Sequence, residues 1–244
     1  MDVEKFSIIC KKSQHELKEW LKEEITKEYI EGDGYLYFKG STPVLLVAHL
    51  DTVHKRLPQK IIIEEDCICA KEGIGGDDRC GIYAILEILK THDISVLFCE
   101  DEESGCIGAE KFVKTELCKK LYGSFKYIME FDRQGYEDAV YYDCDNRELK
   151  EFISSTEYWT EKEGIYSDVL VLGPALGSAY VNLSCGYFNQ HTKEEYVIPS
   201  VIDRCIREAV KLLNKTNEYK YFTYQERSIC EYDKWCTFWE NYNI

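Results

Sequence analysis

The sequence lacks the features that mark membrane-spanning and exported proteins. Its apolar runs stay well short of the 18 or more residues that a membrane-spanning helix requires. The amino terminus, MDVEKFSIICKKSQHELKEW, does not place a basic stretch before an apolar one, as a signal peptide does. We therefore expect no membrane partner and a cytoplasmic location.

Basic residues are scarce relative to acidic residues. The chain has 30 Lys and Arg against 45 Asp and Glu, which gives a formal net charge of −15 at pH 7. Nucleic-acid binding requires clustered Lys and Arg, so the composition predicts no nucleic-acid partner. Many of the bases lie among acids, as in KEWLKEEITKE, which is typical of a solvated helix face.

Cysteine pairs at the spacing of a structural zinc site are also missing. The chain has twelve cysteines, but those within apolar runs stand singly, where a reduced thiol behaves as a small core residue. Cys67 and Cys69 form only a C-x-C sequence with no second pair. We expect reduced cysteines and no zinc site built on them.

What is present suffices for one substantial domain. The chain has 244 residues, 45% of them hydrophobic, and neither a repeat nor a low-complexity linker divides it. We expect one folded domain over residues 1–215. Residues 216–244 are rich in aromatics and acids, and the sequence leaves their packing open.

Strands and helices alternate along this domain. Buried-strand patterns occupy residues 44–50, 94–100 and 127–132, and helical periodicity occupies residues 13–29, 77–92, 108–121 and 199–215. The apolar segments DVLVLG and AYVNLSCGYF precede the last helix. This alternation predicts a three-layer α/β/α sandwich around a mostly parallel central sheet.

Acidic and histidine side chains follow the predicted strands. In open α/β sheets the functional crevice lies beyond the carboxyl ends of the strands. The residues at these places are His49, Asp51, Asp77, Asp78, Glu102, Glu103, Asp132 and His191. Crowded carboxylates raise each other's pKa and destabilise the fold unless a cation neutralises them.

The mixture of imidazole and carboxylate groups suits zinc, with manganese or cobalt as alternatives. The number of groups fits two divalent ions about 3.5–4 Å apart that share a bridging carboxylate. In the stretch VLLVAHLDTV, His49 would bind metal through one ring nitrogen. Asp51, two residues on and on the same side, would accept the N–H of the other nitrogen.

Five motifs in one order resemble those of the co-catalytic di-zinc exopeptidases. The motifs HLDT, GGDDRCG, EDEESGCIGA, EFDRQG and GYFNQHTKEEYV span about residues 44–200. They are similar to motifs of tripeptidase T, carboxypeptidase G, succinyl-diaminopimelate desuccinylase and the single-domain aminopeptidases. The resemblance implies a zinc-dependent exopeptidase-like fold.

The resemblance also implies a role for each residue of the site. The implied metal ligands are His49, Asp77, Glu103, Asp132 and His191, with Asp77 as the carboxylate that bridges both ions. Glu102 is the implied general base, and Asp51 is the implied supporting acid. Asp77 is preferred to Asp78 because it opens the Asp77-Asp78-Arg79 step that matches the family pattern.

The chain departs from the two-domain members of this clan. The segments between His49 and Asp77 and between Asp132 and His191 are too short for a lid or dimerisation insertion. We expect a lid-less architecture similar to the single-domain aminopeptidases, although the motifs are closer to the tripeptidase group. Candidates for the contacts that a lid supplies elsewhere are Tyr180, Tyr187, Ser167 and Asp168.

Each motif has an ordinary explanation when taken alone. HLDT occurs in structural strands, Asp77 and Asp78 could cap a helix, and EDEE is typical of a solvated loop. Five such coincidences, all at strand ends, are a poorer explanation than a metal site. The sequence assigns no role to the remaining histidines, which are His15, His54 and His92.

The predicted function is the metal-dependent hydrolysis of a peptide bond in small peptides, most simply by an aminopeptidase. Glu102 would take a proton from a water activated by the two metal ions. An N-acyl amino-acid amidohydrolase is the alternative, because the machinery at the scissile amide is shared. A non-catalytic metal-binding scaffold is a further alternative. The sequence leaves open the side-chain preference, the native metal and the oligomeric state.

Overall fold

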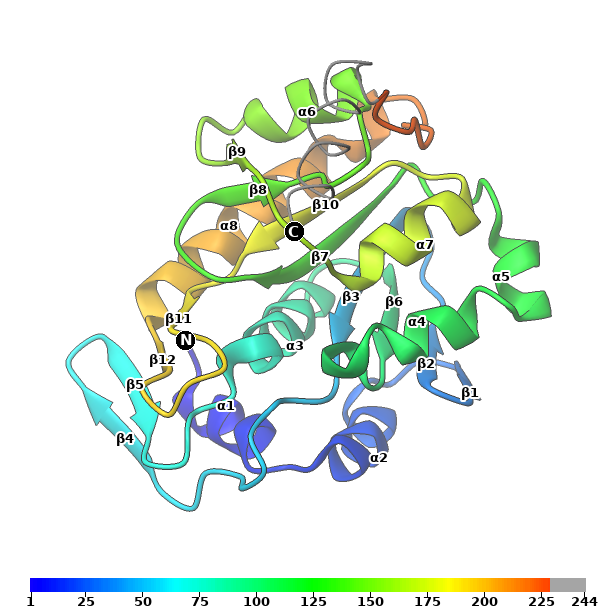
Figure 1. Cartoon of the computed structure of the whole chain (residues 1–244). Coiled ribbons are helices and arrows are strands. Elements are labelled where there is room, and N and C mark those ends of the chain that lie inside the picture. Colours follow the sequence, from blue (N-terminus) through cyan, green and yellow to red (C-terminus); the bar gives the residue numbers. More distant parts are fainter. Residues whose placement is uncertain (229–244) are drawn as a thin grey trace, which may run out of the picture.

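Two β-sheets organise the chain in the computed structural model, which describes residues 1–228 (Figure 1). The strands of the larger sheet are β1 (Tyr29–Gly32), β2 (Tyr35–Phe38), β3 (Thr42–His49), β6 (Ile94–Cys99), β7 (Tyr127–Arg133), β8 (Asp138–Val140), β9 (Thr160–Lys162) and β10 (Tyr180–Ser184). Their spatial order is β1-β2-β6-β3-β7-β10-β8-β9. The smaller sheet consists of β4 (Ile61–Glu64), β5 (Cys67–Ala70), β11 (Tyr187–Phe188) and β12 (Tyr196–Val197), in the order β11-β12-β5-β4.

The centre of the larger sheet is parallel. Strand β3 pairs in parallel with β6 on one side and with β7 on the other, and β7 pairs in parallel with β10. His49 lies opposite Cys99, so β3 and β6 end at the same edge. Every residue of β6 and the last six of β3 are buried, because helices cover both faces.

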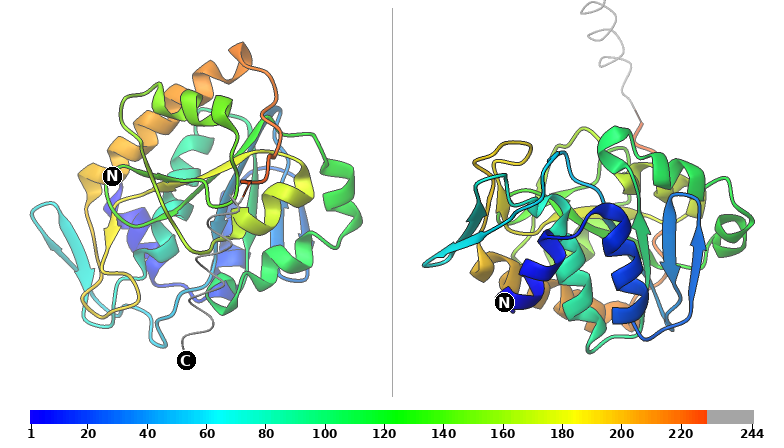
Figure 2. Two further views of the ribbon diagram at one scale, coloured as in Figure 1. Left: turned by 45° about the horizontal axis from the view of Figure 1, so that its top comes forward. Right: turned by 90° about the horizontal axis from the view of Figure 1, so that it is seen from below.

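The helices form two layers. They are α1 (Val3–Cys10), α2 (Gln14–Glu24), α3 (Gly76–Leu89), α4 (Ile107–Phe112), α5 (Glu116–Leu121), α6 (Arg147–Ser154), α7 (Asp168–Leu176) and α8 (Pro199–Lys215). Crossovers to parallel strands are right-handed, and the chain moves in opposite directions from β3 to β6 and from β6 to β7. Helix α3, with α1 and α8 beside it, therefore covers one face, while α4, α5 and α7 cover the other (Figure 2). The predicted three-layer α/β/α sandwich is confirmed.

Several predicted elements differ in their bounds. Helix α2 ends at Glu24, five residues before β1, and Ser13 caps it through a reciprocal capping box with Glu16. The helix predicted over residues 108–121 is two helices, because the Thr115 side chain accepts the N–H of Cys118 and starts α5 anew. The apolar segment DVLVLG forms α7, and α8 matches its prediction at both ends.

Residues 216–228 pack against the larger sheet. Phe222 is 2% exposed and stacks on Phe152 of α6, with ring centroids 5.5 Å apart. The Thr216 hydroxyl pairs with that of Tyr127 at 2.8 Å. The remainder of the C-terminal segment, residues 229–244, lies outside the described residues. No helix within residues 1–228 is long and apolar enough to span a bilayer.

Candidate active site

The carboxyl ends of β3 and β7 and the segment that follows β6 meet at one edge of the larger sheet, beside the start of α3. Within residues 1–228, two groups of side chains could each hold a metal ion, with all ligand atoms of a group within 4.8 Å of one another. One group is His49, Asp77 and Asp132, and the other is Asp77, Glu103 and His191. The structure thus brings together all five predicted ligands, and Asp77 belongs to both groups.

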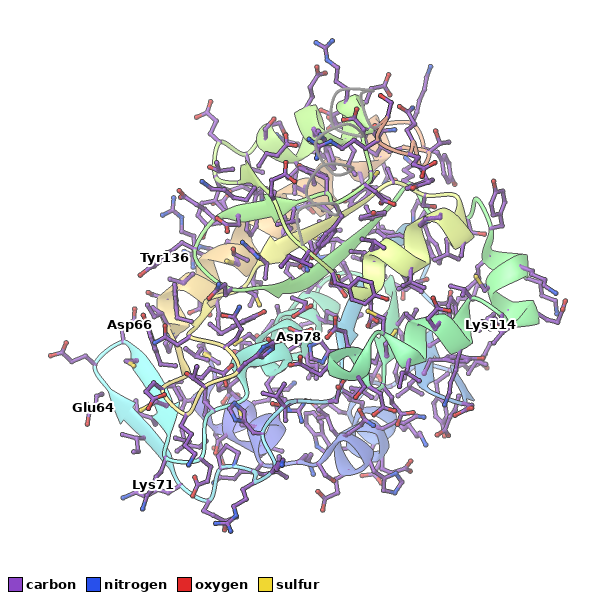
Figure 3. The ribbon with its side chains drawn as sticks, in the orientation of Figure 1. Glu64, Asp66, Lys71, Asp78, Lys114 and Tyr136 are labelled. Carbon is purple, nitrogen blue, oxygen red and sulfur yellow. The ribbon has the colours of Figure 1, made fainter. Side chains whose placement is uncertain are left out.

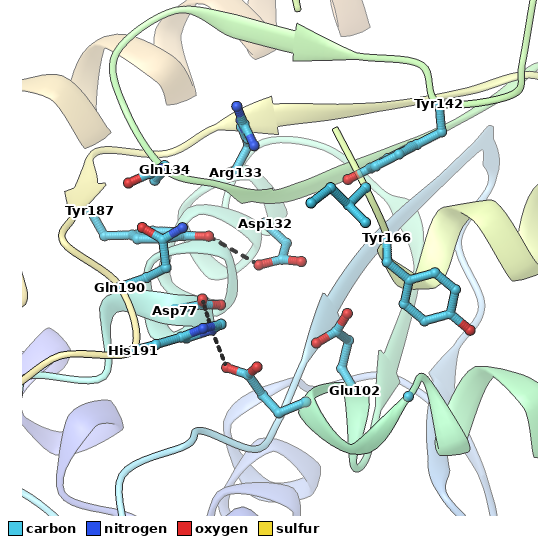
Figure 4. A pocket seen from close by; sticks show the side chains of 13 residues that line it. Asp77, Glu102, Asp132, Arg133, Gln134, Tyr142, Tyr166, Tyr187, Gln190 and His191 are labelled. Atoms are coloured by element: carbon cyan, nitrogen blue, oxygen red, sulfur yellow. Dashed lines mark hydrogen bonds and ion pairs between the residues drawn. The ribbon is translucent and has the colours of Figure 1, made fainter. Parts of the chain in front are cut away.

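The two carboxylate oxygens of Asp77 face different histidines, of which Figure 4 shows His191. Its Oδ1 lies 3.0 Å from Nε2 of His49, and its Oδ2 lies 3.2 Å from Nε2 of His191. Asp132 Oδ1 lies 3.6 Å from Nε2 of His49, and Glu103 Oε1 lies 3.0 Å from Nε2 of His191. A carboxylate placed in this way can contribute one oxygen to each of two adjacent cations.

Asp51 fixes two parts of the site at once. Its carboxylate pairs with Nδ1 of His49 at 3.1 Å and accepts the N–H groups of Glu102 at 2.9 Å and Glu103 at 3.0 Å. Burial opposes its charged form, but the hydrogen bond and charge of His49, together with the two backbone N–H groups, outweigh burial and lower the pKa of Asp51. An ionised Asp51 can only accept, so Nδ1 of His49 carries the proton and Nε2 is free to bind a cation.

Asp77 and Asp78 have different surroundings although they are adjacent. Asp78 is fully buried beneath the site, where its carboxylate accepts the N–H groups of His49 at 3.2 Å and Gly81 at 3.0 Å (Figure 3). It therefore ties β3 to the first turn of α3, which is the capping role that the sequence left open for either residue. The Asp77 carboxylate is left to face the histidines.

The surroundings of Glu103, Asp132 and His191 raise their pKa values and so favour their protonated forms. Burial, followed by the negative charge of Asp77, raises the pKa of Glu103 and of Asp132 to about 7. A hydrogen bond to Asp77 raises the pKa of His191 to about 9. Burial opposes the charged form of Asp77, but hydrogen bonds from His191 and His49 outweigh it and lower its pKa.

These groups fit a pair of divalent cations. Two imidazoles and three carboxylates match the ligand preferences of zinc, and one carboxylate is placed to be shared. Oε1 of Glu103 is buried, and its contact with Nε2 of His191 at 3.0 Å does not have the geometry of a hydrogen bond. A cation would supply the positive charge that the cluster otherwise obtains by binding protons.

Glu102 lines the same cavity without belonging to either metal group. Burial raises its pKa to about 7, and the charges of Asp132 and Asp77 add to this effect while His49 opposes it. A carboxyl group with such a pKa can both take up and release a proton near neutral pH.

Glu195 and His54 support the site, although the sequence assigned a role to neither. Glu195 is fully buried, and its carboxylate accepts the N–H groups of Gly75 at 2.7 Å and Asp77 at 3.0 Å. It also pairs with Nε2 of His54 at 2.7 Å. No sequence signal separates Glu195 from its exposed neighbour Glu194, because the burial arises from the smaller sheet.

Asp132 is held by residues from β10, β11 and the loop before α7. Its N–H is accepted by the Asn182 side chain at 2.9 Å, and its carboxylate accepts the hydroxyl groups of Tyr187 at 3.2 Å and Ser167 at 3.3 Å. Two of the candidates for lid-type contacts thus touch a predicted ligand. Tyr180 does not, because its hydroxyl donates to Asp143 away from the cavity.

The catalytic cavity, as we name the space between these groups, has a volume of about 430 Å³. Asp77, Glu102, Glu103, Asp132 and His191 form its acidic wall. Aromatic and polar side chains complete the lining: Tyr187 and Gln190 lie beside Asp77 and His191, and Tyr142 and Tyr166 lie on the far side of Glu102 (Figure 4). A cavity of this size falls within the range of small-molecule binding sites.

Solved structures with the same fold include peptidases and an enzyme of another class. The aminopeptidase PepT of Bacillus cereus ATCC 10987 aligns with a TM-score of 0.72 at 14% identity, covering 88% of this chain and 98% of that chain. A tripeptidase of Staphylococcus aureus aligns with a TM-score of 0.70 at 13% identity, covering 89% and 98%. The glutaminyl cyclase of Porphyromonas gingivalis aligns with a TM-score of 0.58 at 14% identity, covering 87% and 95%. At these identities the likeness shows the fold and leaves the reaction open.

The family assignment comes from the sequence. No curated protein sequence matches the chain. The sequence model of the family described as "Peptidase family M28" matches residues 34–166. This range is more than half of the chain and includes the segments from His49 to Asp132. The predicted resemblance to the co-catalytic exopeptidase clan is confirmed. The chain belongs to peptidase family M28.

Proposed function

We propose that the protein is a metal-dependent aminopeptidase that removes the first residue from small peptides. Membership in peptidase family M28 supports a metal-dependent peptidase. One observation of the site carries the proposal further. The two oxygens of Asp77 face His49 and His191 from opposite sides, as expected of a carboxylate shared by two ions.

Five side chains would hold the two ions. His49 and Asp132 would serve one ion, Glu103 and His191 the other, and Asp77 both. Zinc is the metal that this donor set favours, with manganese or cobalt as alternatives. Divalent ions here would polarise the scissile carbonyl and lower the pKa of water.

Glu102 would serve as the general base. It projects into the catalytic cavity, and Asp51 holds its backbone N–H at 2.9 Å. Its carboxylate would take a proton from the attacking water and return that proton to the leaving amine. Because Asp51 also orients His49, it sets the position of the base relative to a ligand.

Two alternatives use the same residues. An N-acyl amino-acid amidohydrolase would place an acyl group where the aminopeptidase places a free amino terminus. A scaffold would bind metal without turnover. One experiment separates all three: unblocked peptides and their N-acetylated forms are assayed on zinc-loaded protein whose metal content is measured in the same sample.

We expect two equivalents of zinc per chain and hydrolysis of the unblocked peptides only. Preference for the acetylated forms would support the amidohydrolase, and bound zinc without turnover of either would support the scaffold. Glu102→Gln should keep the zinc and lower kcat by about 10²–10⁴-fold. Glu110→Gln makes the same change on the exposed side of α4 and serves as the control. Near-normal turnover by Glu102→Gln would refute the assignment of the base.

A further inference from the structure

A second cavity, which we name the basic cavity, adjoins the catalytic cavity. It has a volume of about 780 Å³, and His191 lines both cavities. The remainder of its wall comes from the segment after β3, the end of β5 and the loop between β11 and β12. A ligand bound at the metal groups can therefore extend past His191 into this space.

The lining of the basic cavity is positively charged in a chain of net charge −15. Lys55, Arg56, Lys71 and Lys193 line it, and Glu72 is the acid among the lining residues. None of the four bases forms an ion pair with an acid anywhere in residues 1–228, whereas many other lysines there do. Each of the four is exposed, and Figure 3 shows Lys71 at the end of β5.

Buried contacts fix the segments that carry these bases. His54, in the segment after β3, pairs with Glu195 at 2.7 Å. This contact joins that segment to the loop that carries Lys193. Gly73 has a φ of +95° and no side chain, so the His54 ring can occupy the place where a Cβ atom would lie only 2.2 Å from Cε1. Strand β12 pairs with β5, which joins the same loop to the segment that carries Lys71 (Figure 1).

The same buried carboxylate connects the basic cavity to the metal groups. Glu195 accepts the N–H of Asp77, the residue shared by both groups, as well as pairing with His54. The backbone segments that carry the bases are therefore tied to the residues of the metal groups. A cavity that is lined by unpaired positive charges attracts a negatively charged group of a ligand.

We propose that the basic cavity binds a carboxylate of the substrate on the leaving-group side of the scissile bond, which makes the preferred substrates short peptides. This inference rests on the proposed aminopeptidase function. The first residue of the substrate would occupy the catalytic cavity, and the following residues would pass His191. An extended chain covers about 3.3–3.6 Å per residue, so the α-carboxylate of a dipeptide or tripeptide lies within about 10 Å of the scissile bond. An acidic side chain in the second or third residue presents the same chemistry.

The test compares substrates that differ only in this charge. The value of kcat/KM is measured for unblocked trialanine and for its C-terminal amide, at low and at high ionic strength. A second pair of tripeptide amides ends in Asp or in Asn, which separates an acidic side chain from the α-carboxylate. Each exposed charge pair contributes up to about fivefold in affinity, so contacts with two bases predict a preference of about 10-fold. The preference should shrink as salt screens the charges.

The variant Lys55→Gln/Arg56→Gln/Lys193→Gln should bring the ratio of acid to amide kcat/KM close to one, mainly through KM. Lys120→Gln, on the exposed side of α5 and outside both cavities, should keep the wild-type ratio. Hydrolysis of trialanine and its amide with equal kcat/KM by the wild type would overturn this inference and leave the aminopeptidase proposal standing. Failure to hydrolyse any unblocked peptide with zinc bound would refute the proposed function and this inference with it. The salt dependence of the wild-type ratio decides the matter even if the triple variant does not fold.

Discussion

The substitution Glu195→Gln tests whether the buried carboxylate organises the metal groups. Gln has the same shape as Glu but offers one acceptor oxygen in place of two. In the wild type, Oε2 of Glu195 receives the N–H of Gly75 and faces His54, while Oε1 receives the N–H of Asp77. Whichever way the amide group is turned, its NH₂ faces one of these backbone N–H groups, and that buried donor loses its acceptor.

The expected loss of stability follows from these contacts. A buried donor without a partner costs about 1–3 kcal/mol, and the bonds that remain lose the strength given by a charged acceptor. Together these effects predict a decrease of about 2–4 kcal/mol in the free energy of unfolding. For a chain of this length that corresponds to a fall in Tm of about 5–15 °C. The backbone of Asp77 would also lose its support, which predicts a 10–100-fold weaker affinity for zinc.

The assay is urea unfolding of the metal-free protein, followed by zinc titration of the folded variant against a competing chelator. Glu194→Gln is the control, because it makes the same chemical change at the neighbouring position, where the side chain is exposed. Metal-free Glu195→Gln with a free energy of unfolding within about 0.5 kcal/mol of the wild type would refute the reasoning, since surface substitutions stay within that range.

Three further predictions concern the shared ligand, the protons of the site and the packing of residues 216–228. Asp77→Asn should lower the zinc content after dialysis below one equivalent, whereas His191→Ala should retain about one; equal loss in both would contradict a shared ligand. Zinc affinity should rise from pH 6 to 8 with release of protons, because Glu103 and Asp132 have pKa values of about 7 and metal competes with these protons. Calorimetry in two buffers of different ionisation enthalpy measures that release, and an affinity independent of pH would contradict it. Phe222→Ala should lower the free energy of unfolding by about 3–5 kcal/mol, whereas Tyr221→Ala, at an exposed position, should change it little in the same urea experiment.

The buried strands of the larger sheet were predictable because both of their faces are covered. Residues 44–50, 94–100 and 127–132 are predominantly apolar stretches that correspond closely to β3, β6 and β7. The same property left DVLVLG unassigned, because a helix surrounded by apolar neighbours has no polar face to reveal its period. That segment became α7, which packs beside α4 and α5 on one face of the larger sheet.

The proximity of the metal-ligand candidates was predictable from topology. Parallel strands end at one edge, so residues that follow β3, β6 and β7 must approach each other there. The support from Glu195 was not predictable. It depends on the pairing of β12 with β5, which joins segments far apart in the sequence through strands of two and four residues, too short to leave a pattern.

The buried thiols of this fold affect how zinc can be loaded. Eight of the ten cysteines within residues 1–228 are buried, and none of the ten belongs to either metal group. Zinc that meets the folded protein therefore encounters histidines and carboxylates. The unfolded chain exposes all twelve thiols, which are stronger zinc ligands than carboxylates. Zinc present before folding stabilises the unfolded chain as well, so refolding should recover more active protein when a chelator is present first and zinc is added afterwards.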